Sequence, residues 1–184
     1  WLVPKLPVFL SENTGISVNI VTRTTQFDFR LDTVDGAIFF GDGKWSGADT
    51  DYLMGERIVL ACSPEFKATH KLETPHDVLN VPLLHMTSRP DAWEQWLSSN
   101  NVMFDNVHGM LFDQFSTATQ AAVAGLGIAL LPSFLISDEL DSGSLVKAID
   151  ASYDSGDAYY FAASPDRAGY GPLQKFRKWI LYEV

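Results

Sequence analysis

Apolar and polar residues alternate in patterns that predict helices and strands in turn along the whole chain. Residues 1–13 carry leucines and a phenylalanine at helical spacing, which predicts an amphipathic helix, and residues 16–20 alternate as in a half-buried strand. Further strands are predicted at 34–40, 53–61, 81–86, 107–112, 128–131, 145–149 and 159–163, and further helices at 65–69, 75–79, 90–98, 133–140 and from 172 onwards. This alternation is typical of an α/β fold with mainly parallel sheets.

Residues 112–132 combine a strand end, a short helix and a wholly apolar strand. Thr117 and Gln120 have the spacing of a capping box, Ser116 is a neighbouring cap candidate, and Gly125 is expected to stop the helix in the left-handed conformation. A capped helix start at a sheet end can hold a small anion on its N–H groups, but it can equally serve only to stabilise its own helix. The small residues of this helix, which would allow another element to approach closely, are Ala118, Ala121, Ala122 and Ala124.

The composition predicts a folded domain that does not itself bind nucleic acid. The chain has 184 residues, of which 46% are hydrophobic and 12% aromatic, enough for one compact domain or two small lobes. Its net charge is −10, from 13 Lys+Arg and 23 Asp+Glu, whereas a domain that grips a phosphate backbone is expected to be basic. No apolar stretch approaches the roughly 20 residues that span a bilayer, so we expect no contact with membrane.

The chain shows no pattern for disulfides or export. A single cysteine, Cys62, excludes an internal disulfide and favours a reducing compartment. Residues 1–5 lack the charged leader and apolar stretch expected of a signal peptide, and the pattern opens on an amphipathic helix without a preceding strand. We therefore expect it to be a fragment of a longer protein.

No pattern for catalysis, metal binding or nucleotide binding is present. The four histidines lack metal spacing, and the acidic loop 42–51 fails the calcium-loop pattern and is expected to be solvated. The chain has no G-x-S-x-G elbow, and Gly125-Leu-Gly127 follows a helix where a dinucleotide motif follows a strand. Cys62 ends an apolar run, which is typical of a small buried residue rather than a nucleophile. The sequence thus predicts no enzyme, no cofactor and no metal.

Polar and aromatic residues at the ends of predicted strands remain as binding candidates, because ligands of parallel sheets bind at the carboxyl ends of the strands. Arg89 can hold a carboxylate in a bidentate fork, although a surface arginine beside a helix start has the same pattern. Tyr159 can be a ligand contact or a packed ring whose hydroxyl finds any partner, and Trp93 is a core candidate. The set at strand ends is Phe40, Gly41, Ser63, Arg89, Phe115, Ser116, Thr117 and Tyr159.

Eight segments that span nearly the whole chain in order form a familiar set. They are WLVPKLPVF, VDGAIFFGDGKWSG, VLACSPEF, LETPHDVLNVPLLH, RPDAWEQWL, FDQFSTATQAAVAGLGIALLP, GSLVKAID and LQKFRKWI. Together they resemble the effector-binding domain of LysR-type transcriptional regulators, in the subgroup of the glycine-cleavage regulator and the β-lactamase-inducer regulator. The A-x-x-G-x-G-I-A-L-L-P tail is common to the family, and RPDAWEQWL and GDGKWSG indicate the subgroup.

The resemblance implies a two-lobed periplasmic-binding-protein type 2 fold, in which two crossover strands join the lobes and an inter-lobe cleft holds the ligand. Lobe I would contain residues 1–62 and 162–184, and lobe II residues 63–161. Ser63-Pro64 and residues 159–164 would be the crossings. The resemblance also implies that an N-terminal winged helix-turn-helix and the first strand of lobe I are absent from this chain. DNA would then be bound only through the missing domain of the full-length protein.

The same resemblance implies a small-molecule effector, such as an amino acid or another anionic metabolite. Many relatives carry arginine where this chain has Phe39 and a small polar residue where it has Phe115, so the identity of the effector is not carried over. Phe115 is expected to narrow the cleft, and Arg89 to lie at its rim. The ligand-facing residues implied by the family are Phe40, Gly41, Gln114, Phe115, Ser116 and Tyr159.

The resemblance further implies a cytoplasmic homodimer that becomes a tetramer in the full-length protein. The first helix of one subunit would contact the alanine-rich helix near 118–125 of the other. An alternative is a periplasmic solute-binding protein of a transporter, which shares the fold but needs a signal peptide. An enzyme on the same fold would need an acid–base or nucleophile set that this sequence does not present.

Overall fold

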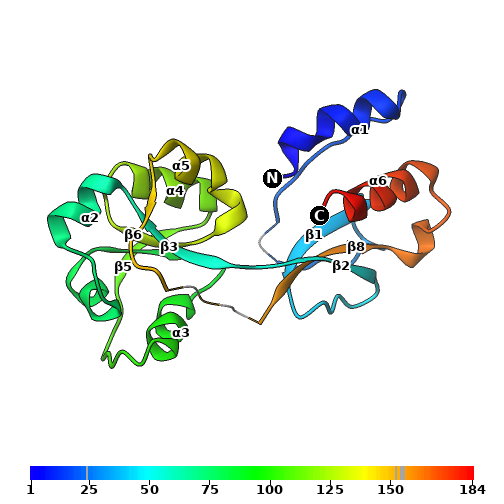
Figure 1. Ribbon diagram of the computed structural model, residues 1–184. Helices are drawn as coiled ribbons and strands as arrows, with labels where there is room; N and C mark the ends of the chain where they lie inside the picture. Colours follow the sequence, from blue (N-terminus) through cyan, green and yellow to red (C-terminus); the bar gives the residue numbers. More distant parts are fainter. Residues whose placement is uncertain (24, 152, 154–155) are drawn as a thin grey trace. The chain divides into compact units, whose positions relative to one another are not determined.

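The computed structural model describes residues 1–23, 25–151, 153 and 156–184, and it contains two compact units (Figure 1). Unit 1 consists of Trp1–Glu56 and Gly156–Val184, and unit 2 of Arg57–Ser155. Unit 1 is therefore built from both ends of the chain, and unit 2 from one continuous segment.

Unit 1 contains a three-stranded antiparallel sheet with the order β1-β8-β2. Its strands are β1 (Gly36–Gly41), β2 (Asp49–Gly55) and β8 (Ala158–Ala163). Its helical segments are η1 (Val3–Lys5), α1 (Leu6–Glu12), η4 (Pro165–Arg167) and α6 (Gly171–Tyr182). The last strand in sequence is thus the middle strand in space, so this sheet cannot form until the C-terminal segment has paired with the N-terminal one.

Aromatic contacts and ion pairs hold α1 and α6 to this sheet. The ring of Phe9 lies 5.4 Å from that of Phe176 and 5.0 Å from that of Trp179. Arg177 on α6 donates to both carboxylate oxygens of Asp51 on β2, at 2.6 and 2.8 Å. These contacts cover the face of the sheet that carries the odd-numbered side chains of β8.

Loops cover the opposite face of the same sheet. Trp45, from the GDGKWSG segment, lies 5.1 Å from the ring of Phe27, 5.3 Å from that of Phe29 and 5.1 Å from that of Phe39. Its indole N–H donates to the carbonyl oxygen of Phe27 at 2.9 Å. The ring of Tyr160 stacks on Phe39 at 5.5 Å. An aromatic cluster therefore covers this face of the sheet, whereas helices cover the other face.

Unit 2 contains a five-stranded mixed sheet with the order β5-β4-β6-β3-β7. Its strands are β3 (Ile58–Cys62), β4 (Leu83–Met86), β5 (Gly109–Phe112), β6 (Ile128–Pro132) and β7 (Val146–Lys147). Strands β4, β5 and β6 are parallel, and β3 is antiparallel to β6 and β7. The prediction of mainly parallel sheets is therefore right for these three strands and wrong for β3 and for unit 1.

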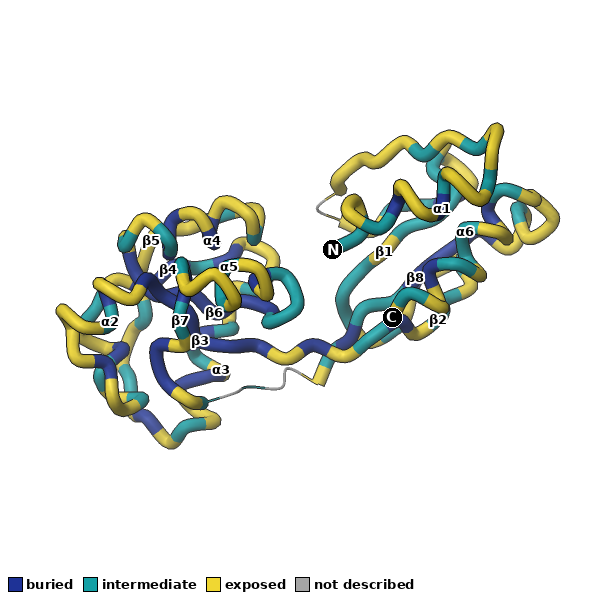
Figure 2. The backbone as a smooth tube through the Cα atoms, turned by 45° about the horizontal axis from the view of Figure 1, so that its top comes forward, coloured by how far each residue is buried: buried dark blue, intermediate teal, exposed yellow. Residues whose placement is uncertain are grey.

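Helical segments cover both faces of the unit 2 sheet (Figure 1). One face carries α2 (Pro64–His70), η2 (Pro75–Asn80) and α3 (Ala92–Ser99), and the other carries α4 (Phe115–Val123), η3 (Ser133–Leu135) and α5 (Ser137–Ser142). Every residue of β3 and β6 is buried as a result, and Figure 2 shows β3 as a continuous buried segment. The prediction of a strand at 128–131 that is covered on both faces is confirmed.

The unit boundaries precede the predicted lobe boundaries at 62 and 161. Strand β3 pairs with β6 and β7, so it lies in unit 2, whereas β8 pairs with β1 and β2, so all of it lies in unit 1. The strand predicted at 53–61 is therefore two strands that belong to different sheets. The strand predicted at 16–20 is wrong, because no strand of the described chain pairs with it, and Ile20 is 52% exposed.

The alanines of α4 pack against the sheet of their own unit. Ala118, Ala121 and Ala122 are 1%, 7% and 0% exposed, and they contact the core formed by β3, β4 and β6. The prediction that these small side chains allow another element to approach closely is confirmed, and that element is the sheet of the same unit. The surface implied for a second subunit is left to the exposed side of this helix.

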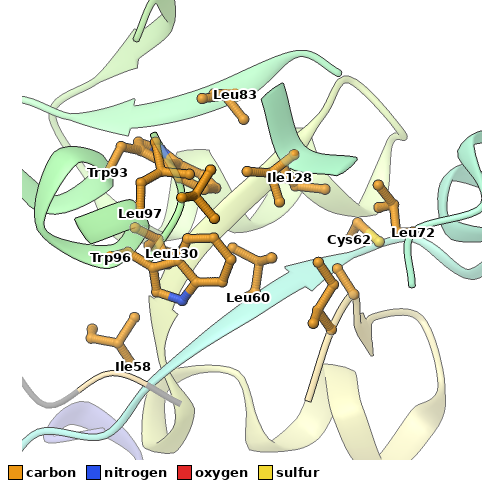
Figure 3. Packing of buried hydrophobic residues seen from close by; sticks show 14 of the residues in the cluster. Ile58, Leu60, Cys62, Leu72, Leu83, Trp93, Trp96, Leu97, Ile128 and Leu130 are labelled. Carbon is orange, nitrogen blue, oxygen red and sulfur yellow. The ribbon is translucent and has the colours of Figure 1, made fainter. Parts of the chain in front are cut away.

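Two tryptophans of α3 form the centre of the core on the other face (Figure 3). Trp93 and Trp96 are 2% and 0% exposed. The indole N–H of Trp93 donates to the carbonyl oxygen of Leu84 at 3.0 Å, whereas that of Trp96 has no hydrogen-bond partner among the described residues. The core prediction for Trp93 is confirmed, and the two indoles differ in one hydrogen bond.

This difference predicts unequal costs for two matched substitutions. Trp93→Phe removes the indole hydrogen bond to the Leu84 carbonyl, whereas Trp96→Phe removes an N–H that is already unpaired. We expect Trp93→Phe to lower the free energy of unfolding by about 0.5–1.5 kcal/mol more than Trp96→Phe. Urea unfolding followed by circular dichroism measures both values. Equal losses, or a larger loss for Trp96→Phe, would contradict this assignment.

Candidate functional site

The described residues include no group of three or more His, Cys, Asp or Glu side chains positioned to hold a metal ion. Cys62 is completely buried, and burial raises the pKa of its thiol to about 11, against a smaller opposing effect of Lys67. The thiol is therefore protonated at neutral pH and unsuited to nucleophilic attack. No helix in the described part of the chain is long and apolar enough to cross a membrane.

In unit 1, three of the predicted site residues lie together. Phe40 pairs with Tyr159 across β1 and β8, and their ring centroids are 5.1 Å apart. Gly41, the last residue of β1, has a φ of +154°, which favours glycine. A Cβ added at Gly41 would meet nothing within 4 Å, so the space at Gly41 itself is open.

Glu56 joins this group, and sequence reasoning missed it. It follows β2, is only 5% exposed, and accepts a hydrogen bond of 2.7 Å from the Tyr159 hydroxyl. It directly follows the part of β2 that pairs with β8, and no local pattern around residue 56 reveals that pairing. The only available signal was the break in the apolar run at Gly55-Glu56-Arg57. The residues Phe40, Gly41, Glu56 and Tyr159 are called the Tyr159 cluster below.

In unit 2, Arg89 and Phe115 meet at the carboxyl ends of two parallel strands. The N–H of Thr87, after β4, donates to the carbonyl oxygen of Phe112, at the end of β5, at 2.8 Å. The two following loops are therefore neighbours. The Arg89 guanidinium lies 4.8 Å from the centre of the Phe115 ring, which is a cation–π contact.

Phe115 is also the first residue of α4, so the arginine lies beside the start of that helix. The predicted capping box is wrong, because α4 begins two residues before Thr117, with Gln114 at the N-cap position and no side-chain cap. Gln114 and Ser116 are exposed next to the first-turn N–H groups, which are anion donors. The residues Arg89, Gln114, Phe115 and Ser116 are called the Arg89 cluster below.

The end of α4 agrees with the prediction. Gly125 has a φ of +75°, its N–H donates to the carbonyl oxygen of Ala122 at 3.1 Å, and the N–H of Leu126 donates to that of Ala121 at 3.0 Å. This is the Schellman arrangement of a helix that ends at a left-handed glycine. The turn leads directly into β6 and so sets where that buried strand begins.

Ser63 has a structural role and lies apart from the Arg89 cluster. Its hydroxyl accepts a hydrogen bond of 3.2 Å from the N–H of Phe66 and so caps α2. Ser63 follows β3, which is antiparallel to β6, so it lies near the amino end of β6, beside Gly125. The Arg89 cluster lies beyond the carboxyl ends of β4 and β5, so it is at the opposite end of the parallel strands from Ser63.

The chain matches one family model and is similar to known transcriptional activators. The LysR substrate binding domain model matches residues 1–184. The glycine cleavage system transcriptional activator of Escherichia coli (strain K12) is 36% identical over 98% of this chain, and the HTH-type transcriptional activator AmpR of Providencia stuartii is 32% identical over 100%. The chain spans 60% and 62% of the length of these two relatives.

The solved structures agree with the sequence relatives. The effector domain of the transcriptional regulator AmpR of Pseudomonas aeruginosa superposes with a TM-score of 0.88 at 27% identity, covering 100% of this chain and 88% of that one. The AmpR effector binding domain from Citrobacter freundii superposes with a TM-score of 0.85, also at 27% identity.

Proposed function

Because the chain belongs to the LysR substrate binding domain family and is an effector-binding domain of LysR-type transcriptional regulators, we propose that it senses a small molecule for a longer DNA-binding protein. The relatives are transcriptional activators, which favours this function over a transporter's solute-binding protein of the same fold. DNA binding would belong to a segment outside this acidic chain. The proposed action is binding without turnover.

The contact between Arg89 and Phe115 carries the proposal for the ligand site. The aromatic face holds the guanidinium beside the start of α4, which reduces the conformational freedom that Arg89 would lose on binding. A guanidinium offers paired N–H donors that match a carboxylate. The first-turn N–H groups of α4 add further donors, which also carry partial positive charge. The Arg89 cluster is therefore suited to an anionic group, and Phe115 supports the arginine as well as shaping the site.

The Tyr159 cluster supplies a second set of contacts in the proposal. In it, the ring of Phe40 lies 5.1 Å from that of Tyr159, whose hydroxyl donates to Glu56. The proposed effector is a small acid, such as an amino acid or another anionic metabolite.

A thermal-shift screen of the purified domain against amino acids, dicarboxylates and peptidoglycan fragments tests this function. A ligand present at about 100 times its Kd stabilises the native state by about 2.7 kcal/mol. For a chain of this length that corresponds to a rise in Tm of roughly 5–10 °C. A screen in which no compound raises the Tm would contradict the proposal.

Substitutions then test the site with any compound that the screen finds. Arg89→Gln, and separately Ser116→Ala combined with Tyr159→Phe, should each weaken binding about tenfold or more, because each removes hydrogen bonds to a charged ligand. Arg30→Gln is the matched control, since that exposed arginine pairs with Asp28 and belongs to neither cluster. Unchanged affinity in the cluster variants, measured by calorimetry, would show that the ligand binds elsewhere.

We further propose that the domain forms homodimers, and tetramers in the full-length protein, through surfaces other than the buried alanine face. On α1, Val8 is 55% exposed, and on the edge strand β5, Met110 and Leu111 are 40% and 65% exposed. The outward face of α4 carries Thr117, Gln120 and Ala124. Exposed apolar side chains on an unpaired edge strand favour contact with a second copy.

This proposal predicts a dimer at micromolar concentration by light scattering. Leu111→Lys should shift the domain towards monomer, because it places a charge on the apolar edge of unit 2. Leu31→Lys is the matched control, since Leu31 is 88% exposed in a loop of unit 1. A monomeric wild-type domain, or equal dimerisation of both variants, would count against this interface.

A further inference from the structure

We propose that His85 and Glu94 form a proton-sensitive contact between β4 and α3 that controls how firmly the edge strand β5 is held in unit 2. Acidification charges His85 and loosens β5. The inference concerns unit 2 alone and goes beyond the proposed function. Only its last step, an effect on effector binding, rests on that function.

Two buried acceptor atoms without partners are the first observation. His85 Nε2 and Glu94 Oε2 are shielded from solvent, and neither has a hydrogen-bond partner among the described residues. Buried polar atoms are nearly always paired, so unpaired ones need an explanation. The other two such atoms in the described chain are the indole N–H groups of Trp96 and Trp179, which are donors.

The hydrogen on His85 explains why these two acceptors do not bond to each other. The imidazole forms a hydrogen bond with the backbone of His108 that raises its pKa, so Nδ1–H is the donor and the neutral Nε2 is an acceptor. A carboxylate oxygen of Glu94 is also only an acceptor. Protonation turns Nε2 into a donor and makes the ring a cation, so the proton is the ligand to which this pair responds.

The position of His85 is the second observation. Side chains alternate along β4, so His85 lies on the same face as Leu83, in the layer that contains Trp93 (Figure 3). The His85 ring is 6.3 Å from the ring of Trp93 on α3. A Cβ added at Gly109 would lie 2.9 Å from His85 Cδ2, so the backbone of β5 passes directly beside the ring. His85 is therefore in contact with both α3 and β5.

The surroundings of His85 disfavour its charged form. Burial is the largest influence and lowers its pKa, whereas the charge of Glu94 and the backbone of His108 raise it by smaller amounts, and the ring of His108 lowers it. These are the titratable groups that act on His85, one from α3 and one from the loop before β5. The net result is a pKa below the ordinary value, so His85 is neutral at neutral pH.

The sign of the pH dependence follows from this lowered pKa. Below the ordinary histidine value of about 6.5, a proton binds better to a His85 that is exposed to water than to the buried one. The stability that this contact supports is therefore complete above that pH and is lost as the pH falls towards the lowered pKa. Acid favours any state in which His85 reaches water.

Strand β5 is the element that opens in such a state. It has four residues, lies at the edge of the sheet, and has β4 as its only strand neighbour in the described chain. Helix α3, on the other side of His85, is anchored by the fully packed indoles of Trp93 and Trp96. Short edge strands with exposed backbone hydrogen bonds are among the first parts of a domain to open.

The opening of β5 reaches the Arg89 cluster through one hydrogen bond. The carbonyl oxygen of Phe112, the last residue of β5, accepts from the N–H of Thr87 at 2.8 Å, and this bond aligns the loops that lead to Arg89 and Phe115. When β5 loosens, this alignment is lost. If the Arg89 cluster binds the effector, as proposed above, acid weakens that binding.

Amide hydrogen exchange at about pH 7.5 and about pH 5.5 tests the inference without a ligand. After correction for intrinsic exchange, the protection of β5 and of the Thr87 amide should fall several-fold in acid, but no more than about tenfold per pH unit, because one proton is linked. The amides of Leu130 and Leu131, in the central strand β6, should change less. His85→Gln should abolish the fall, whereas His76→Gln, at an exposed histidine of unit 2, should leave it unchanged.

Glu94→Gln tests the second member of the pair. It removes a charge that raises the pKa of His85, so NMR should show His85 titrating at lower pH than in the wild type, and the loss of β5 protection should begin at lower pH as well. Glu65→Gln, at an exposed glutamate of α2, should shift neither midpoint. Any compound that the thermal-shift screen finds is then titrated at both pH values into the wild type and His85→Gln. Its own protonation affects both proteins equally, so a larger loss of affinity in the wild type reports the contact.

The outcomes separate this inference from the function. It is overturned if His85 titrates above about 6.5, if β5 protection does not change with pH, or if His85→Gln keeps the wild-type fall. An equal fall in β6 would overturn the local release of β5. If β5 responds but the effector binds equally well at both pH values, the link to the Arg89 cluster is wrong and the proton-sensitive contact stands. A screen without any binder contradicts the sensing function and leaves the exchange result to decide the role of His85.

Discussion

The insertion of β8 between β1 and β2 is the interaction on which the architecture depends. Both neighbours of β8 come from the first third of the chain, so unit 1 exists only when the two ends of the sequence pair. Everything from Arg57 to Ser155 must then be an insertion that folds on its own sheet. The same pairing brings α6 onto α1 and joins Asp51 to Arg177. It also aligns Tyr159 with Phe40 and lets its hydroxyl reach Glu56, so one strand supplies both the frame of unit 1 and its candidate binding surface.

Unit 2 differs from unit 1 because short helices bury its sheet on both faces. The two tryptophans of α3 fill the layer on one side, whereas alanines allow α4 to approach the sheet closely on the other. Because the side chains are large on one face and small on the other, α4 can lie closer to the sheet than α3. The parallel strands β4 and β5 end at the same edge, which is why Arg89 and Phe115 meet although a helix and 25 residues of chain separate their loops.

The features that the sequence predicts well are those that depend on local chemistry. An apolar run at 128–131 has few alternatives to a buried strand, and Gly125 is needed wherever a helix ends with a positive φ. The failures are non-local. Residues 16–20 alternate correctly but form no strand, because a strand requires a neighbour. The capping box at Thr117 is a valid local motif, yet the end of β5 starts the helix at Phe115. From the sequence, Glu56 belongs to a connection between strands that is expected to be exposed, whereas the structure buries it.

The candidate site shows how far a family resemblance reaches. It identified Tyr159, Phe40 and the start of α4, because the motifs around them extend over many residues. It assigned Phe115 the simple effect of a bulky ring in a cleft, whereas the structure gives that ring a contact with Arg89. It left the hydrogen-bond partner of the Tyr159 hydroxyl open, whereas in the structure this hydroxyl donates to the buried carboxylate of Glu56. In both cases a neighbour from another element fixes the position or the hydrogen of the candidate residue. A substitution at Glu56 or Phe115 therefore changes the surroundings of a partner that the sequence motif leaves intact.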